Sequence, residues 1–297
     1  METEDLCVDT HRGIVETVRS RSPRRQPFPL TSNRPVNSLE RLVSLRYSAT
    51  LLLTAALMLG ACQTVDPPAK ADTASSSPPL PLADRVVVID PGHNGGNIDA
   101  PDEINAPVDV GNGEKACDTT GTNTDDGYFE HEFNFDVATR LAALLQAEGA
   151  TVMLTRRNDT GVGPCITERT AVANDADADV SVSLHADGGP PDGSGFHIMQ
   201  PVELDGYNDT VVDTSHDLAV ELAEAMTEVI APADYIGNDG LNPRADMGGL
   251  NLTTVPKVMI ECGNMRNDHD AALMKDAGFR QDLAEAVAVG IARFLDD

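Results

Sequence analysis

The chain has 297 residues, and its 48 acidic and 21 basic residues give it a formal net charge of −27. This acidity argues against nucleic acid as a partner, because nucleic-acid-binding proteins need clustered Lys and Arg to contact phosphates. Hydrophobic residues make up 41% of the chain, which excludes a wholly disordered protein. One apolar run near the N-terminus is too little for a polytopic membrane protein.

The N-terminal segment has the pattern of an export signal. An apolar run over residues 49–61 follows Arg41 and Arg46, and it is shorter than the roughly 20 residues that a membrane-spanning helix needs. The run ends in Leu-Gly-Ala-Cys at residues 59–62, which resembles a bacterial lipobox. This resemblance implies cleavage before Cys62, acylation of its thiol and a lipid anchor to the outer face of the cytoplasmic membrane. The alternative is an ordinary signal peptide in which Cys62 is incidental.

The sequence predicts three parts. Residues 1–61 form a leader with a lipoprotein-type signal peptide, and residues 62–84 form a tether rich in Pro, Ser and Ala. Residues 85–297 form a single folded domain. Because the leader is long for an export signal, we expect translation to start downstream of the first residue, near Val36 or Val43.

The folded domain alternates between strand-like and helix-like segments. Short apolar runs predict strands at residues 86–90, 151–155, 180–184, 195–200 and 257–261. Helical spacing of apolar residues predicts helices over residues 133–149, 166–174, 218–229 and 280–295. This alternation favours an α/β fold with a twisted, mostly parallel sheet flanked by helices. Active sites in such folds lie at the carboxyl ends of the strands.

Two cysteines of this domain lie in loop-type sequence. Cys117 and Cys165 stand among Gly, Thr and Asn residues, and in an exported protein we predict that they form a disulfide. Cys262 follows an apolar strand and is predicted to be a buried free thiol. The long loop over residues 99–127 is interpreted as one wall of the active-site cleft, held in place by the Cys117–Cys165 bond.

Four polar side chains stand where a strand or a helix meets a loop: His93, Glu130, His185 and Glu261. Two neutral imidazoles and a carboxylate can form a zinc site with a fourth position open for water, and a further carboxylate can accept the proton of that water. Each residue also has a purely structural interpretation. The histidines could be hydrogen-bonded loop residues, Glu130 a favourable charge at a helix N-terminus, and Glu261 a buried, paired carboxylate. Spacing alone leaves both interpretations open.

Six short motifs resemble a known family and occur in its order. They are Val88–Gly95, Glu130 with Asn134, Thr155-Arg156 with Asp159, Glu168-Arg169 with Ala173-Asn174, Ser183–Asp187, and Ile260–Asn264. From Arg85 to the C-terminus, the chain resembles the zinc-dependent N-acetylmuramoyl-L-alanine amidases of the Amidase_3 type, and most of all the compact actinobacterial members without a wall-binding domain. This resemblance implies a peptidoglycan hydrolase that cleaves the amide between N-acetylmuramic acid and the L-Ala of the stem peptide.

The same resemblance implies roles for the four polar residues. His93, Glu130 and His185 would bind Zn²⁺, and Glu261 would be the catalytic carboxylate. Glu132 competes with Glu130 as a ligand, but on a helix it points roughly 200° away from Glu130. The register set by the family's Asn position favours Glu130.

Two further residues are candidates for binding the substrate. His197 alternates in a predicted strand after a Gly-rich loop and could line the cleft, although a packed strand histidine fits the pattern equally well. Arg244, together with Asp246, lies in a predicted loop and is a candidate contact for the stem peptide.

Other functions of the same site remain open at this point. A zinc carboxypeptidase would release a terminal amino acid from wall peptides, and a non-catalytic lipoprotein would only bind wall fragments. The expected partners are peptidoglycan or muramyl-peptide fragments and, through the anchor on Cys62, a membrane. We expect a monomer, because one domain with an exposed cleft needs no second subunit.

Overall fold

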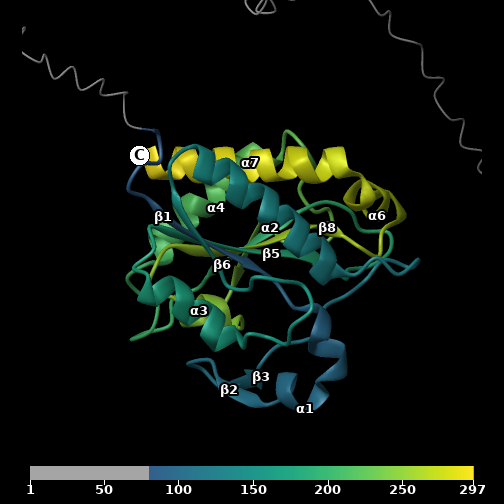
Figure 1. Ribbon diagram of the computed structural model, residues 1–297, viewed down its shortest axis with the longest axis horizontal. Coiled ribbons are helices and arrows are strands. Elements are labelled where there is room, and N and C mark those ends of the chain that lie inside the picture. Colours follow the sequence, from purple (N-terminus) through teal and green to yellow (C-terminus); the bar gives the residue numbers. More distant parts are fainter. Residues whose placement is uncertain (1–79, 297) are drawn as a thin grey trace, which may run out of the picture. The chain divides into compact units, whose positions relative to one another are not determined.

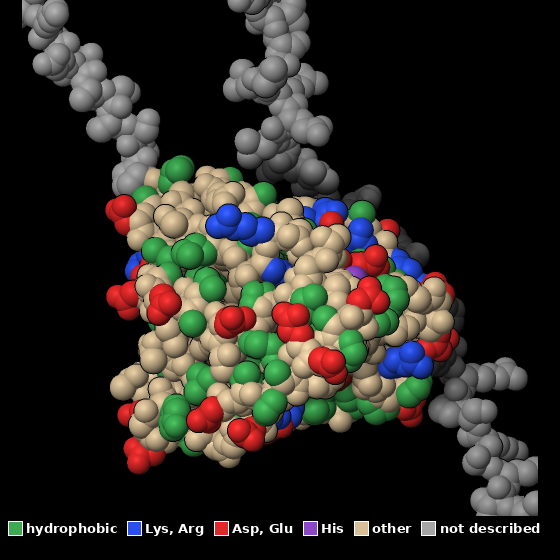
Figure 2. Space-filling model, turned by 60° about the horizontal axis from the view of Figure 1, so that its bottom comes forward, with side chains coloured by type: hydrophobic (Ala, Val, Ile, Leu, Met, Phe, Trp, Pro, Cys, Tyr) green, Lys and Arg blue, Asp and Glu red, His purple; other side chains and the backbone are tan. Residues whose placement is uncertain are grey.

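The computed structural model describes residues 80–296, which form one main sheet with helices on both sides (Figure 1). The predicted export signal, Cys62 and most of the predicted tether lie outside the described residues. Within residues 80–296, no helix is long and apolar enough to cross a membrane. On the face drawn in Figure 2, acidic side chains are spread over the surface, as the strongly negative net charge requires.

The described chain alternates between strands and helices over most of its length. The strands are β1 (Val86–Pro91), β2 (Pro107–Asp109), β3 (Glu114–Ala116), β4 (Thr151–Leu154), β5 (Val180–Asp187), β6 (His197–Pro201), β7 (Leu241–Arg244) and β8 (Lys257–Asn264). The helices are the 3-10 helix η1 (Gly95–Asp99) and the α-helices α1 (Pro101–Ile104), α2 (Glu130–Ala147), α3 (Ile166–Asp175), α4 (Val212–Met226), α5 (Gly248–Asn251), α6 (Asp268–Lys275) and α7 (Ala277–Asp296).

The main sheet has six strands in the order β4-β1-β5-β8-β6-β7. Strands β4, β1, β5 and β8 run parallel to one another, whereas β6 pairs antiparallel with β8 and parallel with β7. The prediction of an α/β fold with a mostly parallel sheet is therefore confirmed. Because parallel strands end at the same edge, the side chains at the ends of β1, β5 and β8 come together there.

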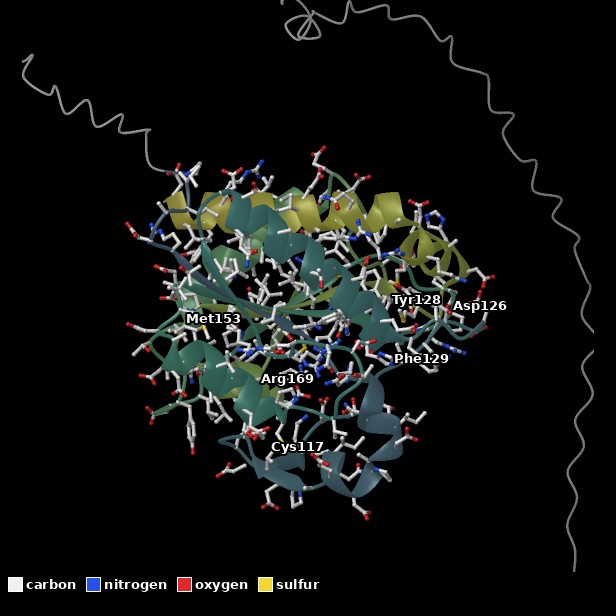
Figure 3. The ribbon with its side chains drawn as sticks, in the orientation of Figure 1. Cys117, Asp126, Tyr128, Phe129, Met153 and Arg169 are labelled. Carbon is white, nitrogen blue, oxygen red and sulfur yellow. A yellow bond between two sulfur atoms is a disulfide. The ribbon has the colours of Figure 1, made fainter. Side chains whose placement is uncertain are left out.

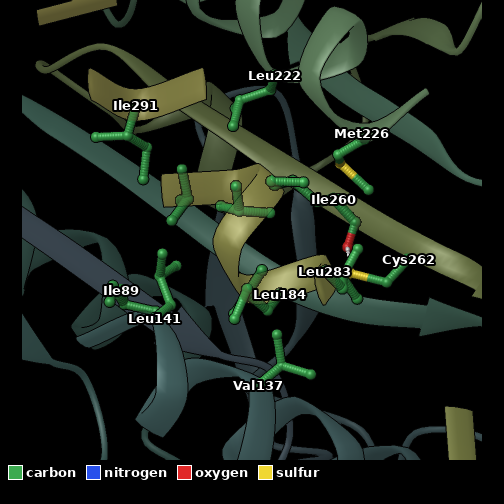
Figure 4. Close-up of a cluster of buried hydrophobic side chains, with 14 of the residues drawn as sticks. Ile89, Val137, Leu141, Leu184, Leu222, Met226, Ile260, Cys262, Leu283 and Ile291 are labelled. Atoms are coloured by element: carbon green, nitrogen blue, oxygen red, sulfur yellow. Dashed lines mark hydrogen bonds between the residues drawn. The ribbon is translucent and has the colours of Figure 1, made fainter. Parts of the chain in front are cut away.

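The two faces of the sheet differ in chemistry, because successive side chains of a strand point to opposite faces. One face carries apolar residues such as Ile89, Leu184 and Ile260, which pack with α2, α4 and α7 in the main core (Figure 4). Their neighbours on the other face include His185 and Glu261, on the side where α3 and α5 lie. Burial of the apolar face thus fixes the direction in which the polar residues point.

The predicted strands and helices are present, with ends that differ by a few residues. The helix predicted over residues 218–229 begins earlier, at Val212, and β6 begins at His197 rather than at residue 195. The sequence analysis did not predict β7, the β2–β3 hairpin or the short helices α1, α5 and α6. Strand β7 contains Asn242 and Pro243, which are residue types depleted in strands, and it lies at the sheet edge, where proline is tolerated.

The residues just before β1 belong to the folded part. Leu82 is buried in the main core, and its backbone N–H donates a hydrogen bond to the Glu148 carbonyl at 2.9 Å. The fold therefore includes the last residues of the segment that the sequence analysis assigned to the tether.

Candidate metal centre

His93 lies just after strand β1, in a tight turn at the edge of the sheet. His93 itself has a φ of 57°, a left-handed conformation that is uncommon for residues other than glycine and often marks functional sites. Gly92 precedes it, and a Cβ atom at this position would overlap the His185 ring. Glycine is therefore needed at Gly92, because it lets the His185 ring from β5 lie directly against the end of β1.

Three of the predicted residues form one cluster: His93, Glu130 and His185. Their possible ligand atoms all lie within 4.8 Å of one another. The Oε1 atom of Glu130 lies 3.1 Å from Nε2 of His93 and 2.9 Å from Nδ1 of His185. The two imidazole rings are 4.9 Å apart and nearly perpendicular. The cluster thus joins the end of β1, the first residue of α2 and the end of β5.

Backbone and side-chain donors fix the carboxylate of Glu130. Its Oε2 atom accepts a hydrogen bond from the Thr122 N–H at 2.8 Å, and its Oε1 atom accepts from the Ala186 N–H at 3.2 Å and from Asn134 Nδ2 at 3.3 Å. The competing residue Glu132 is exposed and accepts a hydrogen bond from the backbone of the residue before α2. The structure therefore brings Glu130, and not Glu132, to the two histidines.

The charges of the cluster perturb one another strongly. Burial by itself lowers the pKa of His93, but the carboxylates of Glu130 and Asp118 outweigh it and raise that pKa to about 10. Burial would raise the pKa of Glu130, yet His93 and His185 hold it well below its usual range. The carboxylate of Glu130 therefore lies between one nitrogen atom of each imidazole. Two imidazole nitrogens and a carboxylate oxygen in this arrangement are the donor set of a catalytic zinc site.

Glu261 lies on β8 beside the cluster. Its Oε2 atom is fully enclosed and has no hydrogen-bond partner among the described residues. Burial raises the pKa of Glu261 well above its usual value, and the negative charges of Glu130 and Asp187 raise it further. An unpartnered carboxyl oxygen with a raised pKa is a frequent feature of catalytic sites, because structural carboxylates are normally hydrogen-bonded.

A cavity of about 400 Å³ opens over these four residues. We call it the first cavity. The loop predicted to form one wall of the cleft lines it through Lys115, Ala116, Asp118, Thr119, Gly121 and Thr122. Asp187 and Asp246 also line it. The predicted disulfide between Cys117 and Cys165 is confirmed, and it joins this loop to the residue before α3.

Arg169, for which no role was predicted from the sequence, makes several buried polar contacts near the site and is labelled in Figure 3. Arg169 is 3% exposed, and its guanidinium donates to Asp90 Oδ1 and to Asp118 Oδ2, both at 2.9 Å. It also donates to the backbone carbonyl of His93 at 3.0 Å. Asp118 in turn lies 3.4 Å from Nδ1 of His93. Only the family motif around Arg169 signalled it, because its partners come from distant parts of the chain.

The two predicted substrate-binding residues do not line the first cavity. His197 is 2% exposed and lies opposite Glu261 in the β6–β8 pairing, with Nε2 3.3 Å from Asp187 Oδ2. Arg244 forms a two-point ion pair with Asp246, at 2.7 and 2.8 Å. Each candidate thus contacts an acidic residue that does line the cavity, and its role in binding stays a prediction. Cys262 is a buried free thiol, as predicted.

An α/β sheet that carries a His-Glu-His cluster at the carboxyl ends of its strands is the architecture of a metallohydrolase. The family model described as N-acetylmuramoyl-L-alanine amidase, Amidase_3, matches residues 87–293. This match covers more than half of the chain, so the protein belongs to the N-acetylmuramoyl-L-alanine amidase family. Members of this family are peptidoglycan hydrolases, and the resemblance found in the sequence is confirmed.

Individual relatives agree with this assignment. The N-acetylmuramoyl-L-alanine amidase Rv3717 of Mycobacterium tuberculosis is 42% identical over 229 residues, which cover 75% of this chain and 91% of that protein. The crystal structure of the amidase Ami1 from Mycobacterium smegmatis matches with a TM-score of 0.69 and 44% identity, over 72% of this chain and 98% of that one. The apo form of Ami1 from Mycobacterium abscessus matches with a TM-score of 0.68 and 39% identity, over 72% of this chain and 100% of that one.

Replacing Arg169 with Met should lower the free energy of unfolding by about 3–5 kcal/mol at pH 7, because Asp90 and Asp118 would stay buried without their cation. Arg169 contributes to holding the pKa of Asp90 far below its usual value, so the ion pair stabilises the native protein above about pH 4. In the variant, Asp90 and Asp118 can each take up a proton as the pH falls from 7 to 4. The difference in unfolding free energy between the variant and the parent protein should therefore be smaller at pH 4. Urea unfolding at pH 7 and pH 4 measures both effects.

The control is Arg157→Met, which makes the same change at an exposed position nearby. It should alter stability by less than about 0.5 kcal/mol. A deficit in Arg169→Met that is equally small would contradict the assignment of the buried ion pairs.

Replacing both Cys117 and Cys165 with Ala should lower the free energy of unfolding by about 3–4 kcal/mol, because the bond joins residues 48 positions apart in the sequence. It should also lower kcat/KM, since Asp118 and Thr122 lie in the loop that the bond holds. Chemical unfolding and steady-state kinetics of the double variant test this. Unchanged stability relative to the oxidised parent protein would show that the bond does not restrain the loop.

Proposed function

We propose that this amidase holds one Zn²⁺ with His93, Glu130 and His185 and uses Glu261 as its catalytic carboxylate. The bond it cleaves is the amide between the lactyl group of N-acetylmuramic acid and the L-Ala of the stem peptide. The observation that carries this proposal is the convergence of the three ligand atoms within 4.8 Å beside an unpartnered carboxyl oxygen. Nitrogen and oxygen donors in this number suit zinc, with one position left for water or substrate.

When bound, Zn²⁺ polarises the substrate carbonyl and lowers the pKa of a nearby water molecule. The chain itself supplies the proton transfers. Glu261 takes the proton of the attacking water and returns it to the nitrogen of L-Ala as the amide C–N bond breaks. Its raised pKa suits this task, because a carboxyl group with a pKa closer to neutrality both accepts and releases a proton at working pH.

Contacts with neighbouring loop residues orient the proposed metal ligands. Nδ1 of His93 lies 3.1 Å from the Thr119 carbonyl and 3.4 Å from Asp118, so Nε2 is the nitrogen that faces Glu130. Such contacts fix the ring tautomer and are typical of metal-binding histidines. The backbone of Thr122 holds the second oxygen of Glu130 in the same way.

His197 and Arg244 remain our candidates for substrate recognition, acting through the acidic residues that they contact. Asp187 accepts hydrogen bonds from Tyr235 Oη at 2.7 Å and from His197 at 3.3 Å, which keep its pKa low despite burial. The charged Asp187 faces the cavity beside Glu261 and can accept an N–H of the stem peptide.

The metal and the reaction can be tested together on N-acetylmuramoyl-L-Ala-D-isoGln. Chelation should abolish release of the dipeptide, and added Zn²⁺ should restore it. Glu261→Gln should lower kcat by about 10²–10⁴ while the protein still binds zinc, because only the proton transfer is lost. Mass spectrometry identifies the products, and metal analysis of the purified variant measures bound zinc.

The matched control for this test is Glu228→Gln, at an exposed position of the α4–α7 side, which should leave kcat unchanged. Release of a terminal amino acid instead of the dipeptide would favour a carboxypeptidase. Retained zinc with no product at all would favour a protein that only binds wall fragments.

We further propose that the protein is exported and anchored by a lipid on Cys62, with the domain acting as a monomer at the outer face of the cytoplasmic membrane. The family acts on the cell wall, which lies outside this membrane, and the lipobox-like sequence supports the anchor. Residues 62–79 then supply a Pro- and Ser-rich tether that lets the domain reach the wall.

The anchor predicts that the protein sediments with membranes and that Cys62→Ala releases it into the soluble or unprocessed pool. Cell fractionation with immunodetection measures this, and the mass of the N-terminal peptide identifies the lipid. Cys7→Ala, in the leader, is the control that should not alter fractionation. An N-terminal peptide of the mature protein that begins elsewhere, or that carries Cys62 without a lipid, would contradict the anchor, and peptides from residues 1–35 in the precursor would contradict a downstream start.

A further inference from the structure

A second cavity adjoins the metal centre. It has a volume of about 450 Å³ and includes among its lining residues Asn94, Ile98, Thr120, Asn123, Phe129, His131, Glu132, Asp159 and Thr160. Gly121 and Thr122 line both cavities, and Thr122 is the residue whose N–H holds Glu130. The two hollows therefore meet at one short segment of the loop, and this segment also holds Glu130.

The position of Glu261 indicates which half of the substrate each cavity would bind. Glu261 lines the first cavity and does not line the second. In the proposed function, Glu261 returns a proton to the amine of L-Ala, so the stem peptide must leave on the side of Glu261. The acyl half of the substrate, which carries the muramic acid, must then extend away from Glu261. The second cavity meets the first at Gly121 and Thr122 and is not lined by Glu261, so it is the hollow left for the acyl half.

We propose that the second cavity binds the pyranose ring of the muramic acid and that Phe129 is the aromatic surface on which the sugar lies. This inference rests on the proposed roles of the metal centre and Glu261. The C–H groups on one side of a pyranose are weakly positive, and they pack against the negative face of an aromatic ring. The hydroxyl and acetamido groups at the edge of the sugar need polar partners in the same cavity.

Phe129 is unusually exposed for an aromatic residue next to a buried cluster. It is 40% exposed, although the residue that follows it, Glu130, is buried. Exposed aromatic surface in a cavity commonly marks a binding site. Its backbone, as the residue before α2, accepts a hydrogen bond from the Phe133 N–H at 3.3 Å, which ties the ring's position to the helix.

The ring of Phe129 packs against the ring of His131, which is itself held by hydrogen bonds. It stacks on His131 with ring centres 5.3 Å apart and an angle of 16° between the planes. Nδ1 of His131 lies 2.8 Å from Asp159 Oδ2, and Asp159 Oδ1 accepts a hydrogen bond from the buried Arg156 at 2.8 Å. Arg156 also donates to the His131 carbonyl at 2.8 Å. A binding surface whose support is fixed in advance loses little conformational entropy when the ligand arrives.

The rest of the cavity matches a sugar better than a peptide. Asn123, Thr120 and Thr160 place amide and hydroxyl groups around the aromatic stack, and Glu132 adds a carboxylate. Such side chains donate and accept hydrogen bonds as sugar hydroxyl groups require. The first cavity instead carries the basic Lys115 and the acidic pair Asp187 and Asp246, which suit the amides and carboxylates of a stem peptide.

The test compares two substrates that contain the same scissile amide. One is N-acetylmuramoyl-L-Ala-D-isoGln, and the other is (R)-lactoyl-L-Ala-D-isoGln, which lacks the sugar. The full chain with zinc bound is assayed beside Phe129→Ala and Phe129→Tyr, and Met153→Ala is a control at an equally exposed residue of β4. Steady-state kinetics give kcat and KM for each pair.

We expect Phe129→Ala to raise KM for the muramoyl substrate roughly tenfold, with kcat nearly unchanged. Its kcat/KM for the lactoyl substrate should stay close to that of the parent protein, and Phe129→Tyr should restore the KM for the muramoyl substrate. Met153→Ala should behave as the parent protein does with both substrates.

Two results would overturn the sugar site. The first is an unchanged KM for the muramoyl substrate in Phe129→Ala. The second is an equal loss with both substrates, which would assign Phe129 a structural role at the start of α2. If the parent protein released the dipeptide from neither substrate, the proposed function itself would fail, and this outcome is distinct from the other two.

Discussion

The metal centre depends on one buried cation. Arg169 neutralises Asp90 at the end of β1 and Asp118 in the long loop, and it also binds the backbone of His93 between them. Removing either carboxylate from water is costly unless a cation pairs with it, so the loop can approach the sheet only where Arg169 meets both. The position of Asp118 beside His93 follows from this arrangement, and the helix that carries Arg169 is itself tied to the loop by the Cys117–Cys165 bond. The positions of His93 and Asp118 are thus set by a buried network of ion pairs and hydrogen bonds around Arg169.

The sheet supplies the second constraint. Ile89, Leu184 and Ile260 fill the core under α2, α4 and α7, and each lies next to a residue that must then face the opposite side. His185 and Glu261 are two such residues, so packing energy orients them towards the cavity without any contact to the substrate. A shift of one residue in the pairing of β5 with β8 would turn His185 or Glu261 into the apolar core and expose core residues. Core and site therefore specify the same register.

Much of this could be predicted from the sequence, because the decisive signals are local. Apolar runs predicted the parallel strands, and the junctions between strands and loops predicted His93, Glu130, His185 and Glu261 as neighbours. The disulfide followed from two cysteines in loop sequence. The roles of Arg169 and Phe129 could not be predicted in this way. The role of Arg169 depends on its ion pairs with Asp90 and Asp118, which are 79 and 51 positions away in the sequence. The proposed role of Phe129 depends on the exposure of its ring, which is known only from the folded structure. The alternating pattern around His197 is compatible with a residue that lines the cleft. In the structure, however, the antiparallel pairing of β6 with β8 buries His197 beside Asp187.

The buried charges also explain how a strongly acidic protein keeps an anionic site intact. Beneath the metal centre, Asp90 and Asp118 carry two negative charges, and Arg169 and the buried Lys257 carry two positive ones. Burial lowers the pKa of Lys257, and the nearby charge of Asp90 opposes this shift. In the proposed zinc form, Glu130 and Glu261 likewise balance the two charges of the metal. These two groups of buried charges are then each neutral. The pKa of Glu261 is set by its burial and by its immediate neighbours, Glu130 and Asp187 among them.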